Sequence, residues 1–154
     1  MRRAVITGMG IVSCLGNDKE SVTHSLKNGI SGIRRRDDFA EMGLRCNVGG
    51  LIDLDPKDHI DRKVLRFMGD SAAFGYIATD RAIADAGLSE ELVTSLRTGL
   101  IMGSGGLSGE MFVEAVDVMR ARGIKRAGPY RVTQIMASTV SACIATPFKI
   151  KGVN

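Results

Sequence analysis

Only two runs of this chain have the composition of buried β-strands, and each leads into glycine. The runs are residues 3–7, followed by Gly8, and residues 99–102, followed by the loop GSGGLSG at 103–109. Unbroken apolar and β-branched runs are typical of strands that are buried on both faces of a sheet. Two strands make a poor sheet, so we expect further strands to come from residues beyond 154, from another chain or from the segment between the runs.

Apolar residues at helical spacing predict the helices between and after these strands. An N-terminal cap pattern at Asn17 and Glu20 begins one helix, which ends near Gly29. Residues 61–86 predict a single long helix of about 39 Å that is closed by Gly87. The same spacing predicts three more helices, at residues 89–96, 110–120 and 132–148. Residues 33–56 show no sustained hydrophobic period, so we expect an exposed irregular segment with short strands there. The order of elements indicates an α/β fold in one domain, 1–154.

Composition narrows the class of protein. With 154 residues, 44% of them hydrophobic and 25% charged, the chain has the balance of a soluble globular domain. No apolar run reaches the ~18 residues of a membrane span, and the start MRRAVITGMG lacks the features of a signal peptide, so we expect a cytoplasmic protein without membrane contact. The formal charge of +4, with two Tyr, five Phe and no Trp, does not favour nucleic-acid binding.

The motifs that could carry chemistry are weak when each is taken alone. TGMGIVS at 7–13 resembles a phosphate-binding glycine turn, but Ser13 replaces the third glycine. GSGG at 103–106 lacks the residues of a P-loop or of a serine nucleophile turn, so a packing or gating loop is favoured over a nucleophilic Ser104. His24 and His59 fall at surface positions of a helix and a turn.

The three cysteines, Cys14, Cys46 and Cys143, are odd in number and widely spaced. This spacing predicts neither disulfides nor a metal site. Cys143 lies inside a helical run between Ala142 and Ile144, where no base or helix N-terminus would lower the pKa of its thiol. A small buried side chain is therefore favoured over a nucleophile.

Basic residues gather at two places in the sequence. Arg62, Lys63 and Arg66 lie near one helix start, and Arg122, Lys125 and Arg126 lie in a later turn. Composition alone favours a solvated face, and the alternative is a docking patch for an acidic carrier or for phosphate.

Five separated blocks resemble the N-terminal part of the β-ketoacyl-[acyl-carrier-protein] synthase family, the last one most closely its type I members. The blocks are RRAVITGMGIVSCLG at 2–16, IDRKVLRFMGDSA at 60–72, AIADAGL at 82–88, GLIMGSGG at 99–106 and GPYRVTQIMASTVSACIATPFKIKGVN at 128–154. They follow in order over almost the whole chain, and only 33–58 matches loosely.

The resemblance implies the thiolase fold, layered α-β-α-β-α, of which this chain would be an incomplete N-terminal half. It implies a homodimer that elongates fatty acids by a decarboxylating Claisen condensation, with an acyl carrier protein as partner and no cofactor. The family's nucleophilic cysteine follows the strand that begins at Gly-Val-Asn, here residues 152–154, and its histidines and lysine come later still. Cys143 matches a helix position, so none of the catalytic set lies in these residues.

The resemblance also implies binding residues. Those matching the carrier-facing positions are Arg62, Lys63, Arg66, Arg122 and Lys125. Met136 matches a residue that reaches the partner subunit's acyl pocket, and Gly105, Gly106 and Leu107 match the loop beside that pocket and the dimer contact. The closest family pattern has Gly where Leu107 stands, which leaves the preferred chain length open.

These observations predict the N-terminal part of a synthase, inactive as an isolated chain of 154 residues. An alternative is a non-enzymatic fragment or module that binds an acidic carrier through its basic face. Nucleotide binding at TGMGIVS is a third hypothesis, which titration with NAD and ATP would test.

Overall fold

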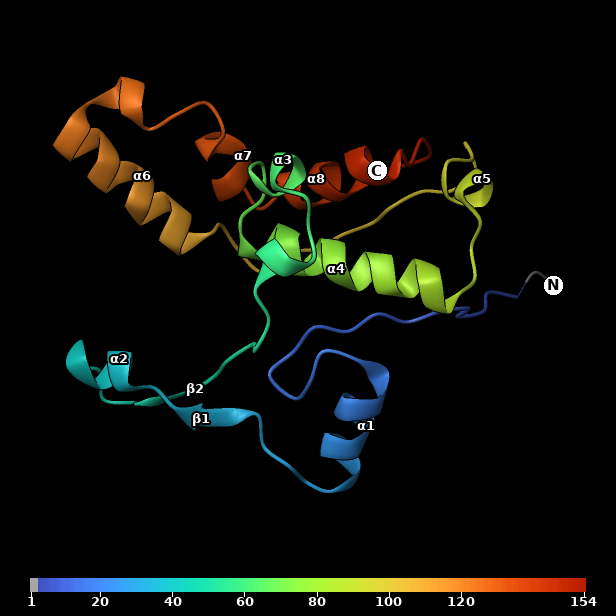
Figure 1. Cartoon of the computed structure of the whole chain (residues 1–154), viewed down its shortest axis with the longest axis horizontal. Coiled ribbons are helices and arrows are strands. Elements are labelled where there is room, and N and C mark those ends of the chain that lie inside the picture. Colours follow the sequence, from blue (N-terminus) through green and yellow to red (C-terminus); the bar gives the residue numbers. More distant parts are fainter. Residues whose placement is uncertain (1–2) are drawn as a thin grey trace.

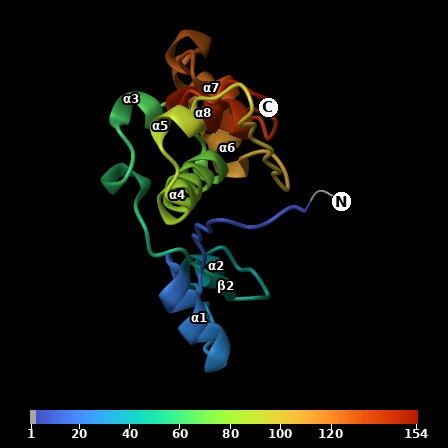
Figure 2. The ribbon, with the colours of Figure 1, turned by 90° about the vertical axis from the view of Figure 1, so that its right-hand side faces the viewer.

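A computed structural model describes residues 3–154 of the chain, and it places the helix α4 (Asp70–Asp85) at the centre. Helices α7 (Arg131–Ile135) and α8 (Thr139–Phe148) lie along one side of α4, and α6 (Gly109–Arg122) extends away from its N-terminal end (Figure 1). A lobe formed by α1 (Lys19–Lys27), α2 (Asp37–Glu41) and a small sheet lies on the opposite side (Figure 2). The molecule therefore has two lobes, with α4 between them.

The other helices and strands of the described residues are short, and irregular segments connect them. They are the strands β1 (Ile33–Arg35) and β2 (Val48–Gly50), the 3₁₀ turns η1 (Pro56–Asp58) and η2 (Ile124–Arg126), and the helices α3 (Arg62–Leu65) and α5 (Glu90–Val93). None of the helices in residues 3–154 has both the length and the apolar character needed to cross a lipid bilayer.

The core lies between α4 and α8. Its buried side chains are Ile60, Met68, Ala72, Ala73, Ile77, Val140 and Ile144. Small residues on α4 let α8 come close: a Cβ atom added to Gly75 would lie 3.0 Å from the Cδ1 atom of Ile144, which is fully buried. Tyr76 stacks on Phe148 with a centroid distance of 4.8 Å and extends the contact along both helices.

The single helix predicted for 61–86 is wrong, because the chain breaks between α3 and α4. Gly69 is extended, with φ −86° and ψ 176°, and caps the N-terminus of α4. A Cβ atom at Gly69 would clash with the carbonyl oxygen of Gln134, so the break lies where α7 crosses the chain. The closing position was predicted correctly, since Gly87 has a φ of +62° just after α4.

The helix predicted for 132–148 is also divided in two. Met136 has φ −70° and ψ 128°, which ends α7, and α8 begins at Thr139. The hydroxyl of Thr139 shares its one proton between the carbonyls of Thr133 (2.7 Å) and Met136 (2.6 Å), so this side chain holds the corner between the two helices.

Neither predicted strand forms a β-ladder within the described residues, and this prediction is corrected. Neither residues 3–7 nor residues 99–102 form a strand, and the observed sheet pairs β1 with β2 in antiparallel register, which confirms the short strands predicted within 33–56. Two backbone hydrogen bonds join the second run to the end of the chain: Leu100 N donates to Val153 O (2.8 Å) and Gly152 N donates to Thr98 O (2.9 Å). The backbone N–H and C=O groups of a strand need hydrogen-bond partners on a neighbouring strand, and the described residues supply too few of them for these two runs.

Glycines and ion pairs attach the N-terminal segment and α1 to α4. A Cβ atom at Gly8 would lie 2.5 Å from the carbonyl oxygen of Ala82, and one at Gly10 would clash with the carbonyl of Ala78. Lys19, in the first turn of α1, pairs with Asp85, which also accepts a 2.9 Å hydrogen bond from Met9 N. The close approach explains both glycines of TGMGIVS by packing.

The start of α1 differs from the prediction by one residue. Its N-cap is Asp18 rather than Asn17, and the Asp18 carboxylate accepts a 2.7 Å hydrogen bond from Ser21 N. Asn17 instead donates from Nδ2 to the carbonyl of Asp53 (3.0 Å), which ties the start of α1 to the chain leaving the small sheet.

We predict that Gly10→Ala lowers the free energy of unfolding by about 2 kcal/mol or more, because the new methyl group must displace α4. Gly103→Ala is the matched control, since a Cβ atom at Gly103 meets no other atom within 4 Å. Urea unfolding followed by circular dichroism measures both variants. Equal stability of the two would contradict the close packing of this segment on α4.

Candidate functional site

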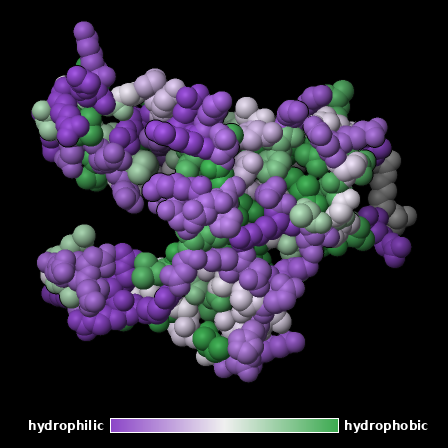
Figure 3. All heavy atoms as spheres, viewed as in Figure 1, coloured by the Kyte–Doolittle hydropathy of each residue, from purple (hydrophilic) through white to green (hydrophobic). Residues whose placement is uncertain are grey.

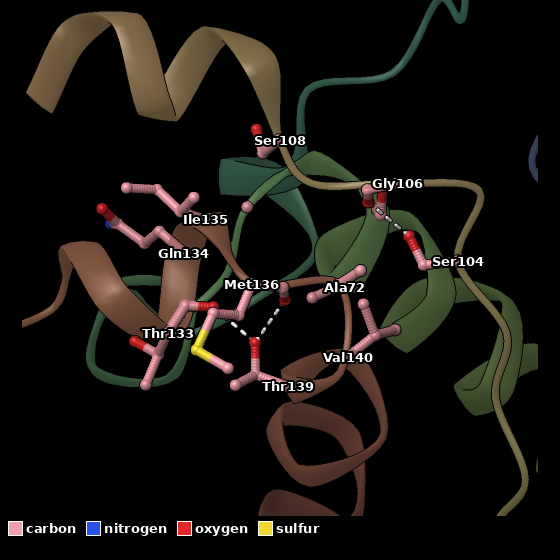
Figure 4. A pocket seen from close by; sticks show the side chains of 13 residues that line it. Ala72, Ser104, Gly106, Ser108, Thr133, Gln134, Ile135, Met136, Thr139 and Val140 are labelled. Carbon is pink, nitrogen blue, oxygen red and sulfur yellow. Dashed lines mark hydrogen bonds between the residues drawn. The ribbon is translucent and has the colours of Figure 1, made fainter. Parts of the chain in front are cut away.

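A narrow crevice lies where α7 and α8 meet the glycine loop and the start of α4. Met136 and Gly106 line it from opposite sides, together with Gly69, Ser71, Ala72, Ser104, Ser108, Thr133, Gln134, Ile135, Ala137, Thr139 and Val140 (Figure 4). The crevice has room for about 10 Å³, close to that of one water molecule. The structure thus brings together two of the residues expected at an acyl pocket, in a crevice too small for an acyl chain.

The other two residues expected beside this pocket do not line the crevice. Gly105 and Leu107 are both exposed, and the Leu107 side chain keeps 58% of its surface accessible. Ser104 donates a 2.9 Å hydrogen bond to the carbonyl of Gly106, so its hydroxyl stabilises the turn of the loop. This contact agrees with a packing or gating loop better than with a nucleophilic serine.

Two of the expected carrier-facing residues lie at a larger groove. Arg62 and Arg66 line a hollow of about 730 Å³ between η1, α3, α4 and α6, and Lys57 contributes a third cationic side chain. Leu65 and Met68 supply apolar surface. Asp55 and Asp70 also line the groove, and the Asp55 carboxylate lies 3.9 Å from the Lys57 ammonium, so Arg62 and Arg66 supply the charge that suits an acidic, amphipathic partner.

Lys63 lies elsewhere on the same short helix. It lines a mainly apolar hollow of about 360 Å³, together with Val64, Phe67, Thr133, Thr139, Ala142, Cys143, Thr146 and Pro147. A helix of four residues presents neighbouring side chains in different directions, so Arg62 and Lys63 serve different hollows. The sequence spacing alone did not separate them.

The side chain of Arg66 is held by two aromatic rings. Its guanidinium carbon lies 4.9 Å from the ring centroid of Phe67 and 5.0 Å from that of Tyr130. These two rings meet edge to face at 4.9 Å, so they form a corner beneath the cation. The two rings therefore hold the guanidinium of Arg66 in one position.

Arg122 and Lys125 lie at the far end of α6 and in η2, a segment well separated from α3 in Figure 1. Both are exposed, and within residues 3–154 neither forms an ion pair. By contrast, the arginine run at 34–36 is neutralised by Asp53, Asp37 and Asp38. Unlike that run, the cationic side chains of α3 and of the tip of α6 make no ion pair within the described residues.

Cys143 has the environment of a structural thiol. Its Sγ atom donates to the carbonyl of Phe67 at 3.4 Å, and burial raises the pKa of the thiol. Neither histidine lines the hollow that contains Cys143: His24 is exposed on α1, where its ring lies 3.3 Å from the amide of Asn28, and His59 is exposed after η1. Within residues 3–154, no three His, Cys, Asp or Glu side chains gather as metal ligands would.

Gln134 is the residue at these sites that the sequence did not single out. It lines both the crevice beside Met136 and the groove beside Arg66, and its Nε2 atom donates a 3.0 Å hydrogen bond to the carbonyl of Arg66. The only sequence signal was a polar side chain within the mainly apolar run VTQIMA.

Comparisons with known proteins identify relatives over the whole chain. A family model described as β-ketoacyl synthase, N-terminal domain, matches residues 1–154. The chain is 56% identical over 155 residues to 3-oxoacyl-[acyl-carrier-protein] synthase 1 of Haemophilus influenzae, covering 100% of this chain and 38% of that protein. It is 52% identical over 156 residues to the Escherichia coli K12 protein of the same name, with the same coverage. The chain thus spans 38% of the length of these curated relatives.

A solved structure gives the same result for the fold. The β-ketoacyl synthase from Burkholderia phymatum STM815 superposes with a TM-score of 0.83 at 28% identity, over 99% of this chain and 38% of that one. This likeness confirms the α/β fold class expected from the sequence, with the chain matching part of a larger fold.

We predict that iodoacetamide labels Cys46 at least about tenfold faster than Cys143 at neutral pH, because Cys46 is exposed whereas burial disfavours the Cys143 thiolate. Since the pKa of Cys143 is raised, its labelling should increase only at more alkaline pH than is usual for a thiol. Peptide mass spectrometry after timed quenching measures both rates. Faster labelling of Cys143 would restore it as a candidate nucleophile.

Proposed function

Because the chain belongs to the β-ketoacyl synthase family through that family's N-terminal domain, we propose that it works as the N-terminal part of a longer 3-oxoacyl-[acyl-carrier-protein] synthase. The reaction is the elongation of an enzyme-bound acyl group with malonyl-carrier, with loss of carbon dioxide. In this proposal the nucleophile and the decarboxylation residues come from the remainder of the longer protein. The 154 residues provide the support and part of the binding surface.

The observation that carries the proposal is the apolar surface on the two extended runs. Val5 is 77% exposed, Ile6 85% and Ile101 91%. In Figure 3 hydrophobic side chains gather on the right of the molecule, where Figure 1 places the N-terminal segment and the end of the chain. An exposed apolar surface of this kind in a globular protein marks an interface, so we propose that further strands of the longer protein cover it.

The hydrogen bonds at residues 152 and 153 support the same arrangement. Residues 98–100 and 152–153 run side by side, with Gly152 bonded to Thr98 and Leu100 bonded to Val153. A strand continuing from Asn154 would extend this pairing along residues 101–103. That continuation would carry a nucleophile at its far end, in agreement with the resemblance described above.

We assign carrier docking to Arg62, Lys63 and Arg66 on and beside α3, with Arg122 and Lys125 as a second contact. The relatives' name includes an acyl carrier protein as the substrate-bearing partner. Among these residues Arg66 has the firmest support, from its two aromatic neighbours. Charge contacts of this kind steer association and are screened by salt.

We assign Met136, Gly105, Gly106 and Leu107 to the wall of an acyl pocket that a second copy completes. Leu107 and Met136 expose 58% and 46% of their surfaces, and both border the crevice or its loop. A dimer contact would cover these apolar side chains, and the crevice would open only when Met136 moves. A cytoplasmic homodimer is the form of the protein that this proposal expects.

We predict that the isolated chain of 154 residues does not condense malonyl-carrier with an acyl donor, whereas the longer protein does. Release of carbon dioxide and mass spectrometry of the carrier measure the reaction. Intact mass spectrometry of the source material establishes which form exists there. Turnover by the isolated chain would sink the proposal, and carrier binding by a longer protein without turnover would favour the non-enzymatic alternative.

We predict that Arg66→Glu in the longer protein weakens binding of holo-acyl carrier protein by about tenfold or more, and that added salt reduces the difference. Arg97→Glu is the control, because Arg97 is exposed and lies beyond α5. Fluorescence anisotropy of a labelled carrier gives both dissociation constants. Equal weakening by the two substitutions would place the docking surface elsewhere.

A further inference from the structure

A chain of hydrogen bonds runs from α6 through α7 to Arg66. The guanidinium of Arg131 binds both carboxylate oxygens of Glu114, with Nη1–Oε2 at 2.8 Å and Nη2–Oε1 at 2.7 Å. The same Nη1 atom lies 3.4 Å from Oε1 of Gln134, whose Nε2 atom donates to the Arg66 carbonyl at 3.0 Å. The Arg131 contact therefore orients the amide so that its donor faces Arg66.

These side chains are among the contacts that hold the helix α7 in place. It has five residues, and its N-cap, Tyr130, makes no side-chain capping bond. Helices this short are unstable by themselves in water, so their placement comes from outside contacts. Arg131 also donates from Nε to the carbonyl of Ala127 at 3.2 Å, which fixes the turn before the helix.

Arg66 is therefore held twice by this one segment. Gln134 binds its carbonyl, at the C-terminal end of α3, and Tyr130 lies beneath its guanidinium at 5.0 Å. Both contacts come from residues next to Arg131 in sequence or in space. The Glu114–Arg131 ion pair connects that segment to the long helix α6, beside a backbone hydrogen bond from Ser108 N to the carbonyl of Ile135 (3.0 Å).

We propose that Arg131 is a positioning residue, which holds the docking arginine Arg66 in its carrier-binding orientation through Gln134 and Tyr130. This inference rests on the function proposed above and adds a residue outside the set implied by the family resemblance. Arg131 itself keeps only 21% of its side-chain surface accessible and is engaged by Glu114. It acts through Arg66 and not as a second charge facing the carrier.

The Glu114–Arg131 ion pair can hold α7 in place throughout the neutral pH range. The hydrogen bonds from Arg131 lower the pKa of Glu114 below its ordinary 4.5, so the pair stays ionised throughout the neutral range. A bidentate pair also has a fixed geometry that a lysine would not reproduce.

The test uses the longer protein and labelled holo-acyl carrier protein. We expect Arg131→Ala to weaken binding about three- to tenfold, and Arg97→Ala, which also removes one positive charge, to change it by less than about twofold. Gln134→Met, which removes the amide without changing charge, should match Arg131→Ala. Because Arg131 acts through Arg66, adding Arg131→Ala to Arg66→Ala should weaken binding further by less than about twofold.

The outcomes separate this inference from the proposal beneath it. If Arg66→Ala weakens binding but Arg131→Ala and Gln134→Met behave like Arg97→Ala, the positioning role is overturned and the docking site stands. If the fold-weakening of carrier binding by the double variant equals the product of the effects of Arg131→Ala and Arg66→Ala, Arg131 acts independently and the inference also fails. If the unaltered protein binds no carrier, or Arg66→Ala has no effect, the proposed docking site and the inference fall together.

Discussion

The close approach of other segments to α4 is the constraint on which the remaining structure depends. One side of this helix presents Ala72 and Gly75 to α8, and another presents the backbone at Ala78 and Ala82 to Gly8 and Gly10. Larger side chains at these positions would move both layers outward. The places of α8, the N-terminal segment and the lobe beyond it all follow from the small residues of one helix.

Much of this arrangement could be predicted from sequence, because it is encoded locally. Helical spacing located α1, α4, α6 and α8, and Gly87 marked the end of α4. The breaks at Gly69 and Met136 could not be found in this way. Gly69 lies against Gln134, a residue distant in sequence, and the apolar period continues across both breaks. The two extended runs have the composition of strands, yet a ladder also requires partners, which composition does not reveal.

The site shows the same division between composition and arrangement. The resemblance supplied Met136 and a role for the basic residues that the sequence had already grouped, but it did not show that Arg62 and Lys63 line different hollows or that Arg66 lies on an aromatic corner. Arg131 and Gln134 gave almost no signal, since a single arginine or glutamine in a helix is ordinary. Their role depends on Glu114, from a different helix, and only the folded chain brings the three together.

The separation of α4 from α8 along the chain also affects how the protein is made. Helix α4 ends at Asp85 and α8 begins at Thr139, so a ribosome adds roughly 50 residues after one helix before it starts the other. At ~5–20 residues per second, the apolar face of α4 waits roughly 3–10 s for its cover during synthesis. Apolar surface left open for that time favours non-native association, so the arrival of α8 is the step that protects α4 during synthesis.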